Sequence, residues 1–382
     1  MSWFKKLFSK NKDKNNKKVK KEEEFYYASQ RQLIWWRFKK HKLAIIGMVV
    51  LAILYFVSIF ASFFSPYGVR ERHREFISAP PTSIRFISEE NGLRTPFVYK
   101  MTREMDTDTF QYIYTKDKSQ EYTIRFFVET EPYNLLGFIP FRWQFFGAEE
   151  DVPIFLFGTD RLGRDLFSRV IFGGRISLFI GFAGVLLSFV LGCFFGGISG
   201  YFGGAVDEII QRIIDLLICI PTIPLWMGLS AAVPRDWGVT QTYFAITIVL
   251  AIVGWAGLAR VVRGKLLSLR EEEFALAAKA AGCTNFRIIY KHLLPSFISF
   301  LIVHITLAIP SMILGETALS FLGLGMQPPA VSWGVLLQDA QNISVVANRP
   351  WIMIPVLFVI VTVLMFNFLG DGLRDSADPY SN

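Results

Sequence analysis

The segment Leu43–Phe64 is a run of 22 residues without a charged side chain. At about 1.5 Å per residue, a helix of that length crosses a hydrocarbon core of about 30 Å, so the run predicts a membrane-spanning helix. Five more apolar runs follow, with predicted bounds Ile176–Tyr201, Ile209–Val233, Tyr243–Val262, Ser296–Leu322 and Pro350–Leu369. Six such runs, in a chain with 52% hydrophobic residues, predict a polytopic membrane protein rather than a soluble domain.

The amino-terminal segment 1–42 is strongly basic. It holds about fourteen Lys and Arg against four acidic residues, so the net charge of +8 resides in this tail. The positive-inside rule favours a cytoplasmic position for such a flank, and anionic lipid attracts it. We predict a cytoplasmic tail without a fold over Met1–Glu24, and an interfacial helix over Phe25–Lys42 that leads into the first transmembrane helix at 43–64. Nucleic-acid binding is the less favoured alternative.

The segment 65–157, between the first and second apolar runs, has a different pattern. Ser83–Ile87, Phe110–Tyr114 and Tyr122–Glu129 carry β-branched and aromatic residues in partial alternation, and Gly, Asp and Pro separate them. This pattern predicts a small β-rich domain. Because one span separates the domain from the cytoplasmic tail, we expect it to lie outside the cytoplasm.

Counting crossings from a cytoplasmic start places the other connections. The predicted cytoplasmic segments are Gly200–Asp207, 263–295 and the carboxyl terminus, and the predicted outer segments are Pro234–Thr242 and Gly323–Arg349. Basic residues are frequent in 263–295, as the positive-inside rule requires. Four arginines disagree with this rule, since they fall on the outer side: Arg161, Arg164, Arg169 and Arg175.

The predicted fold class is therefore an all-α polytopic membrane protein of the cell membrane, with six transmembrane helices and both termini in the cytoplasm. Residues 158–382 form the core with helices 2–6, and a small β-rich extracytoplasmic insert separates helices 1 and 2. Gly192 and Gly196, in the second span, have the GxxxG spacing that lets two helices approach closely. Packing within the chain and packing against another subunit are equally compatible with this spacing.

A polar, helix-forming segment, Glu271–Ala281, lies in the long cytoplasmic connection. It consists of good helix formers with acidic residues in the first turn, and Gly282 follows as a C-cap. Five alanines leave its backbone accessible, which suits insertion into a groove on a partner protein. The alternative, an amphipathic helix lying on the membrane, has only Phe274 and Leu276 as apolar bulk. Docking onto a protein outside the bilayer is the favoured interpretation.

Several segments resemble a known family. AAKAAG (Ala277–Gly282) followed by LLP (Leu293–Pro295) resembles the EAA loop of permeases from ATP-binding cassette importers, with Leu276 in place of the usual glutamate and His292 in place of an isoleucine. The longer string EEEFALAAKAAG is similar to the dipeptide and oligopeptide branch of that family. The other segments that resemble this branch are Arg37–Leu51, Phe157–Leu178, Gly200–Gly204 with Asp207, Ala318–Gly334 and Asp371–Pro379.

The resemblance implies a subunit that forms half of a translocation pathway for peptides or oligosaccharides. The implied partners are a second permease, two cytoplasmic ATPase subunits that bind ATP and Mg, and an extracytoplasmic substrate-binding protein. The chain itself is expected to be non-catalytic and to bind no cofactor, since it lacks the string GxxxxGK[ST]. A bulky charge at Ala278 is expected to uncouple the ATPase. The residues implied in ATPase coupling are Glu271, Glu272, Glu273, Phe274, Ala277, Ala278, Lys279 and Gly282.

Charged residues in or near the spans are further candidates, because an unpaired charge in hydrocarbon costs several kcal/mol. Glu208, Arg212 and Asp215 are spaced to pair along one helix face, either as a structural group or as part of a gate. Glu316 is isolated in the fifth span, where it either faces the pathway or forms hydrogen bonds within the bundle. Four residues either contact the binding protein or organise the entry into the second span: Asp160, Arg161, Arg164 and Asp165.

An ion-coupled secondary transporter or channel is the alternative function, with Glu316 and the Asp215 group as an ion relay. It gives the alanine-rich segment no purpose, so the importer subunit is favoured. Neither a metal site nor a disulfide is predicted, because the four histidines are scattered and the three cysteines have no paired spacing.

Overall fold

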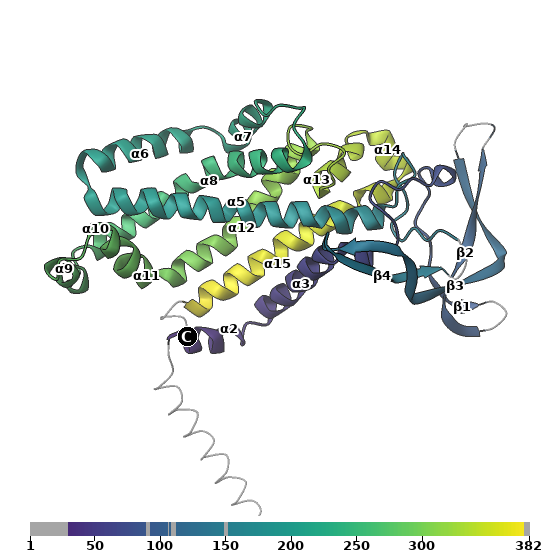
Figure 1. Cartoon of the computed structure of the whole chain (residues 1–382), viewed down its shortest axis with the longest axis horizontal. Helices are drawn as coiled ribbons and strands as arrows, with labels where there is room; N and C mark the ends of the chain where they lie inside the picture. The colour runs from purple at the N-terminus through teal and green to yellow at the C-terminus, as the bar shows by residue number, and fades with distance from the viewer. Residues whose placement is uncertain (1–29, 89–91, 106, 108–111, 149–151, 378–382) are drawn as a thin grey trace, which may run out of the picture.

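Five long helices run along one axis and form the body of the molecule (Figure 1). The computed structural model describes residues 30–88, 92–105, 107, 112–148 and 152–377. The long helices are α3 (Lys42–Ile59), α5 (Leu166–Phe202), α8 (Val239–Leu269), α12 (Ile298–Phe321) and α15 (Ile354–Ala377). Within the described residues, these five are long and apolar enough to cross a membrane singly.

In the part of the chain that the structure describes, a sixth span exists only if α6 (Gly204–Cys219) and α7 (Thr222–Ala231) are counted together, because the chain bends by 93° between them. The bend follows from Pro221. Its ring disfavours helical backbone at the preceding residue, and Ile220 is extended, with φ −82° and ψ 130°. The span expected over Ile209–Val233 is therefore a bent pair of helices rather than one continuous helix.

Glycines hold α5 and α8 close together. A Cβ atom on Gly196 would lie 2.5 Å from the carbonyl oxygen of Ala259, and one on Gly192 would lie 2.9 Å from side-chain carbons of Leu258. Non-bonded carbon atoms do not approach each other or an oxygen that closely, so only glycine permits this contact. The GxxxG spacing of α5 thus serves packing inside the chain.

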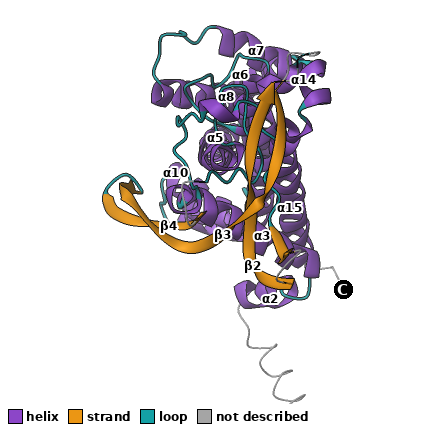
Figure 2. Ribbon diagram, turned by 90° about the vertical axis from the view of Figure 1, so that its right-hand side faces the viewer, coloured by secondary structure: helices purple, strands orange, loops and turns teal. Residues whose placement is uncertain are grey.

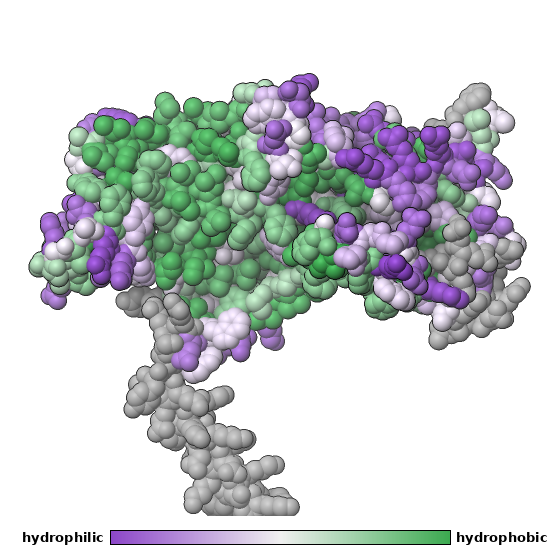
Figure 3. Space-filling view, viewed as in Figure 1, coloured by the Kyte–Doolittle hydropathy of each residue, from purple (hydrophilic) through white to green (hydrophobic). Residues whose placement is uncertain are grey.

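The main apolar core lies between the long helices. Buried Trp333, from the segment after α12, fills part of it and donates its indole N–H to the carbonyl oxygen of Val170 at 3.0 Å. The outward faces of the helices are also apolar, and Figure 3 shows a broad hydrophobic band between two more hydrophilic ends. This is the surface of an integral membrane protein, in which lipid rather than water contacts the apolar band.

A four-stranded antiparallel sheet lies at one end of the bundle, and in the sequence it falls between α4 (Ala61–Phe64) and α5 (Figures 1 and 2). Its strands are adjacent in chain order: β1 (Arg85–Ser88), β2 (Gly92–Met105), β3 (Tyr112–Leu135) and β4 (Ile139–Ala148). β3 pairs with β2 through its first half and with β4 through its second half. Of the expected β segments, Ser83–Ile87 overlaps β1 and Tyr122–Glu129 lies within β3, whereas 110–111 fall outside the described residues.

The remaining elements are short. They are α2 (Gln30–Phe38), η1 (Arg74–Phe76), α9 (Glu273–Ala280), α10 (Asn285–Arg287), η2 (Ile288–Leu293, a π-helical turn), α11 (Leu294–Ser296), α13 (Trp333–Leu336), η3 (Leu337–Gln341), α14 (Ile343–Asn348) and η4 (Pro350–Met353). His41, between α2 and α3, approaches Asp375 near the end of α15 to 3.3 Å, and α9 lies toward this same end, opposite the sheet (Figure 1). Of the expected tail, residues 1–29 fall outside the described residues.

Candidate functional sites at the two ends of the bundle

α9 is the short helix of the polar segment that the sequence indicates. It covers Glu273–Ala280, within the expected Glu271–Ala281. Gly282 follows it with a φ of +77°, a left-handed conformation that favours glycine. The amide of Gly282 donates to the carbonyl oxygen of Lys279 at 3.0 Å, which closes the last turn and fixes the length of the helix.

One face of α9 packs against the chain itself. Ala275 and Ala278 are buried, the latter 9% exposed, in a cluster with Ile288 and Ile289 of η2 and Leu266 of α8. Their small side chains let α9 lie close on η2. The structure corrects part of the expectation that five alanines leave the backbone of this segment accessible, because Ala275 and Ala278 are covered by their own chain.

The opposite face of α9 is exposed, together with parts of α10 and η2. Leu276 is 52% exposed. Phe286 and Tyr290 are also exposed, and their rings stack with centroids 6.2 Å apart and an interplanar angle of 4°. Apolar anchors among charged groups are typical of a protein–protein interface. We name the exposed residues of this face the docking surface, after the role that the sequence predicts for the segment: Glu271, Glu272, Glu273, Phe274, Leu276, Ala277, Lys279, Gly282, Phe286 and Tyr290.

The loop that carries the docking surface is tied to the ends of three helices. Tyr201 of α5 donates to the side-chain oxygen of Asn285 at 3.1 Å. Arg263 of α8 donates twice to Asp207 of α6, at 2.5 Å each, and Asp207 also accepts from Ser199 of α5 at 2.5 Å. The Tyr201–Asn285 contact thus joins the loop to α5, and the Arg263–Asp207 pair joins α8, from which the loop emerges, to α6. Sequence reasoning did not find this ion pair, since 56 residues separate its members and no local pattern links them.

The charged group on α6 differs from the expected arrangement. Arg212 and Glu208 are exposed and 3.8 Å apart, but Asp215 forms an ion pair with Arg260 of α8 instead of with Arg212. An interhelix pair thus attaches α6 to α8. Ile214 is the one buried residue of α6, a helix that the structure describes throughout. Ile214 packs against Trp255 of α8, whereas the charged Glu208 and Arg212 and the neighbouring apolar Ile209 and Ile213 face outward.

Glu316 lies inside the bundle rather than on an open surface. It is fully buried in α12, and its carboxylate accepts hydrogen bonds from Ser177 of α5 at 3.1 Å and from Ser320 at 2.8 Å. The same two hydroxyl groups accept the backbone N–H of Trp333 at 3.1 Å and of Met326 at 2.9 Å. Glu316 therefore joins α5, α12 and the segment that follows α12. Of its two expected roles, this geometry supports hydrogen bonding within the bundle.

Asp160 is a buried hub in the segment that leads to α5. It is 3% exposed, and its carboxylate accepts from Nε of Arg164 at 2.7 Å and from the guanidinium of Arg169. Arg161 points to the surface, where it pairs with Asp339 at 3.1 Å. Asp160 thus organises this entry segment, and of the four candidate residues Arg161 is the one with an exposed side chain.

Asp165 caps α5 by accepting the backbone N–H of Ser168 at 2.7 Å, so the helix begins at Leu166 rather than at the expected Ile176. Burial raises the pKa of Asp165 from its ordinary 3.8 to about 7. Between these values the unfolded chain has lost the proton and the folded chain still binds it. The free energy of unfolding should therefore fall as the pH rises from about 4 to 7, on the order of 4 kcal/mol from this group alone.

Thermal unfolding of the detergent-solubilised protein at pH 5 and pH 8 checks this pH dependence. Asp165→Asn keeps an oxygen that can accept the Ser168 hydrogen bond but has no titrating proton, so its unfolding temperature should change less between the two pH values. An equal change in the wild type and in Asp165→Asn would show that another group is responsible.

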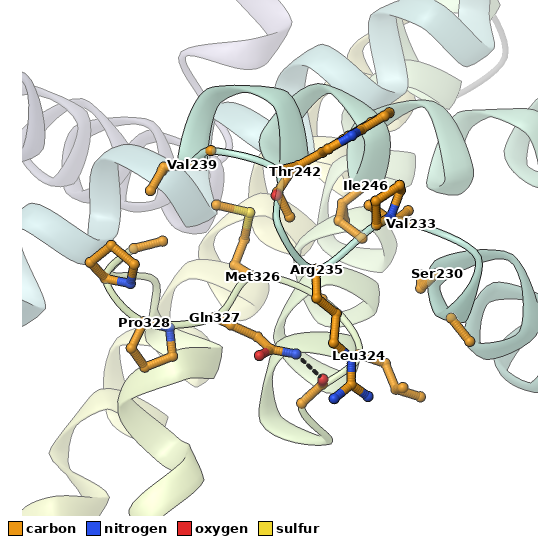
Figure 4. Close-up of a pocket in the computed structure, with 18 residues that line it drawn as sticks. Ser230, Val233, Arg235, Val239, Thr242, Ile246, Leu324, Met326, Gln327 and Pro328 are labelled. Carbon is orange, nitrogen blue, oxygen red and sulfur yellow. Dashed lines mark hydrogen bonds between the residues drawn. The ribbon is translucent and has the colours of Figure 1, made fainter.

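A pocket of about 220 Å³ opens between the α7–α8 connection and the segment after α12 (Figure 4). Arg235 is the one charged residue in its lining. Gln327 lies at the pocket and donates to the carbonyl oxygen of Gly323 at 2.5 Å. Most of the lining comes from Pro234–Thr242 and Gly323–Arg349, two connections that the sequence assigns to the same side of the membrane, and the structure brings them together.

Two family models match the chain. Residues 188–380 match the family described as binding-protein-dependent transport system inner membrane component, and residues 29–81 match the N-terminal TM domain of oligopeptide transport permease C. The strands β1–β4 lie between the two matched segments.

Individual proteins are also similar. The dipeptide transport system permease protein DppC of Bacillus subtilis is 42% identical over 224 residues, which are 58% of this chain and 68% of the relative. The oligopeptide transport system permease protein OppC of Escherichia coli K12 is 43% identical over 224 residues, which are 58% of this chain and 72% of the relative. Among solved structures, a chain of the inward-facing MetNI methionine ABC transporter is 19% identical, with a TM-score of 0.45 over 55% of this chain and 97% of that chain.

Proposed function

The chain belongs to the family of binding-protein-dependent transport system inner membrane components, and from this premise we propose that it is a permease subunit of an ATP-driven importer of peptides. The similar relatives are named for dipeptide and oligopeptide transport, which favours peptides over oligosaccharides, the other substrate class that the sequence allows. The chain forms half of the pathway, and a second, different permease subunit forms the other half.

We infer that the α9 end of the bundle faces the cytoplasm and the sheet end faces outward. α2, the end of α15 and α9 lie toward one end, and the basic residues of 30–42 and 263–295 gather there with them. The positive-inside rule supports this orientation. The bent pair α6 and α7 then completes six crossings, with both termini in the cytoplasm and the pocket at Arg235 toward the outer side.

The single observation that carries the proposal is the exposed docking surface on a firmly tied loop. It offers apolar anchors to cytoplasmic ATPase subunits, of which two are expected in the complex. When these close on ATP they move α9 as a rigid lever, and the contacts Tyr201–Asn285 and Asp207–Arg263 pass the motion to α5, α6 and α8. Access then switches between the two sides, and an external binding protein delivers the peptide.

Uptake into vesicles tests this function. With the assembled complex and its binding protein, labelled peptide should accumulate when ATP is supplied and the proton and sodium gradients are collapsed by ionophores. A non-hydrolysable ATP analogue should stop accumulation. Uptake that needs an ion gradient and ignores ATP would favour the ion-coupled alternative and overturn the proposal.

A further inference from the structure

The β3–β4 hairpin has an apolar tip, where a hairpin in water carries polar turn residues. The segment Tyr133–Phe141, with the sequence YNLLGFIPF, contains no charged residue. Phe138 at the turn is 74% exposed, and Leu136 is exposed with a φ of +56°, a conformation that favours Gly or Asn. The turn thus presents large apolar side chains where its backbone favours small or polar ones. This indicates that the apolar side chains contact something outside the chain.

The base of this tip lies against the end of the first membrane span. α4 continues α3, and the ring of Phe63 lies 6.1 Å from that of Phe141 in β4, between centroids. Phe141 and Phe138 are three residues apart. Since successive strand residues are about 3.3 Å apart, the tip lies on the order of 10 Å from the end of the span. The tip is therefore close enough to the end of the span to reach the membrane surface.

Aromatic contacts continue from the lipid-facing side of α3 to the hairpin. Phe56 of α3 is exposed on the apolar band, and its ring lies 6.0 Å from that of Phe64. Phe64 in turn lies 5.3 Å from Phe145 of β4. In Figure 2, which looks along the bundle from the sheet end, the β3–β4 hairpin extends sideways beyond the outline of the helices. The hairpin thus extends over the space that lipid occupies beside the bundle.

We propose that the tip, Leu136–Ile139, inserts into the adjacent leaflet of the bilayer, so that the β3–β4 hairpin anchors the insert on the membrane surface. Tyr133 and Trp143 flank the tip and are joined by a hydrogen bond from the Tyr133 hydroxyl to the Trp143 carbonyl oxygen, 2.6 Å long. Both residue types favour the interface between lipid and water. Exposed Arg142 adds a cation at the level of lipid phosphates.

Lipid is the occupant that this position favours, because the tip continues an apolar face that the bilayer already covers. The proposal needs only that the long helices span a bilayer, and it is independent of coupling to ATP. Anchoring at a second point beside α3 restrains the tilt of the first span, which packs chiefly against α15. It also holds the sheet at a set height above the pathway.

Spin labelling of the full chain in lipid nanodiscs, in the complex that co-purifies with it, tests the anchor. The three cysteines are first replaced by serine, and a single label is placed at Phe138→Cys. The matched control is Ile87→Cys, which is 69% exposed in β1 at the opposite edge of the same sheet. Because both sites are exposed, a label disturbs the fold little, and gel filtration confirms that each variant is intact.

The label at 138 should be relaxed by oxygen, which dissolves in lipid, and should lose relaxation by a water-soluble nickel chelate. The label at 87 should respond to nickel. Nickel access at 138 equal to that at 87 would place the tip in water, and protection of 138 from both reagents would place it against protein. Either result would overturn the lipid anchor.

Discussion

Replacing Leu276 by aspartate should reduce ATP-driven uptake at least tenfold while the subunit still inserts into the membrane. Leu276 is 52% exposed on the docking surface, so the variant puts a carboxylate where the proposed ATPase groove is apolar. An unpaired charge buried in an interface costs about 3–5 kcal/mol, and each 1.4 kcal/mol is about tenfold in affinity. The amount of ATPase that co-purifies with the subunit, and the initial rate of uptake, measure the effect.

Ile343→Asp is the matched control for Leu276→Asp. Ile343 is 84% exposed in α14, at the other end of the bundle, so the same type of change there should leave the ATPase bound. Ala278→Arg, which the sequence suggests, is a less specific probe because Ala278 is buried against η2 and a large side chain there disturbs the loop itself. Normal ATPase recovery and uptake in Leu276→Asp would contradict the coupling role of this surface.

Asp160→Ala should lower the free energy of unfolding by about 3–5 kcal/mol, the usual cost of removing one partner from a buried ion pair. The substitution leaves the buried guanidinium of Arg169 without its carboxylate, and Arg164 loses a 2.7 Å hydrogen bond. The segment that positions the start of α5 then loses the carboxylate that joins its two arginines. The thermal unfolding temperature of the detergent-solubilised protein, and its monodisperse yield, report the loss.

Glu208→Ala controls for the general effect of removing an acidic partner of arginine. Glu208 and Arg212 are exposed and 3.8 Å apart, and exposed pairs contribute little, so the unfolding temperature should hardly change. Equal decreases of the unfolding temperature in the two variants would mean that burial does not determine how much the Asp160 cluster contributes to stability.

The spans could be predicted from the sequence because the thickness of the hydrocarbon core requires about 20 consecutive apolar residues in each spanning helix. Leu43–Phe64 became α3 and α4, and the predicted fifth span overlaps α12. The break between α6 and α7 was missed because hydropathy alone gave a continuous run, although Pro221 marks the bend. Local capping chemistry likewise gave the end of α9 at Gly282.

The site was only partly predictable because its contacts join distant segments. Helix propensity located α9, but the burial of Ala275 and Ala278 depends on η2, which packs on that side for tertiary reasons. The partner of Asp215 is Arg260 on another helix, whereas spacing along one helix suggested Arg212. In each case the side-chain environment comes from an element that the local pattern does not contain.

The exposed state of α6 bears on how the cell makes this protein. Ile214 of α6 packs against α8, but Ile209 and Ile213 are exposed beside the charged side chains of Glu208 and Arg212, so this helix presents a mixed apolar and charged surface. In the proposed complex, the second permease subunit covers this mixed surface. We therefore expect the cellular lifetime of the chain to follow the supply of its partner permease: newly made copies without a partner are substrates for membrane proteases, and balanced synthesis of the two subunits protects both.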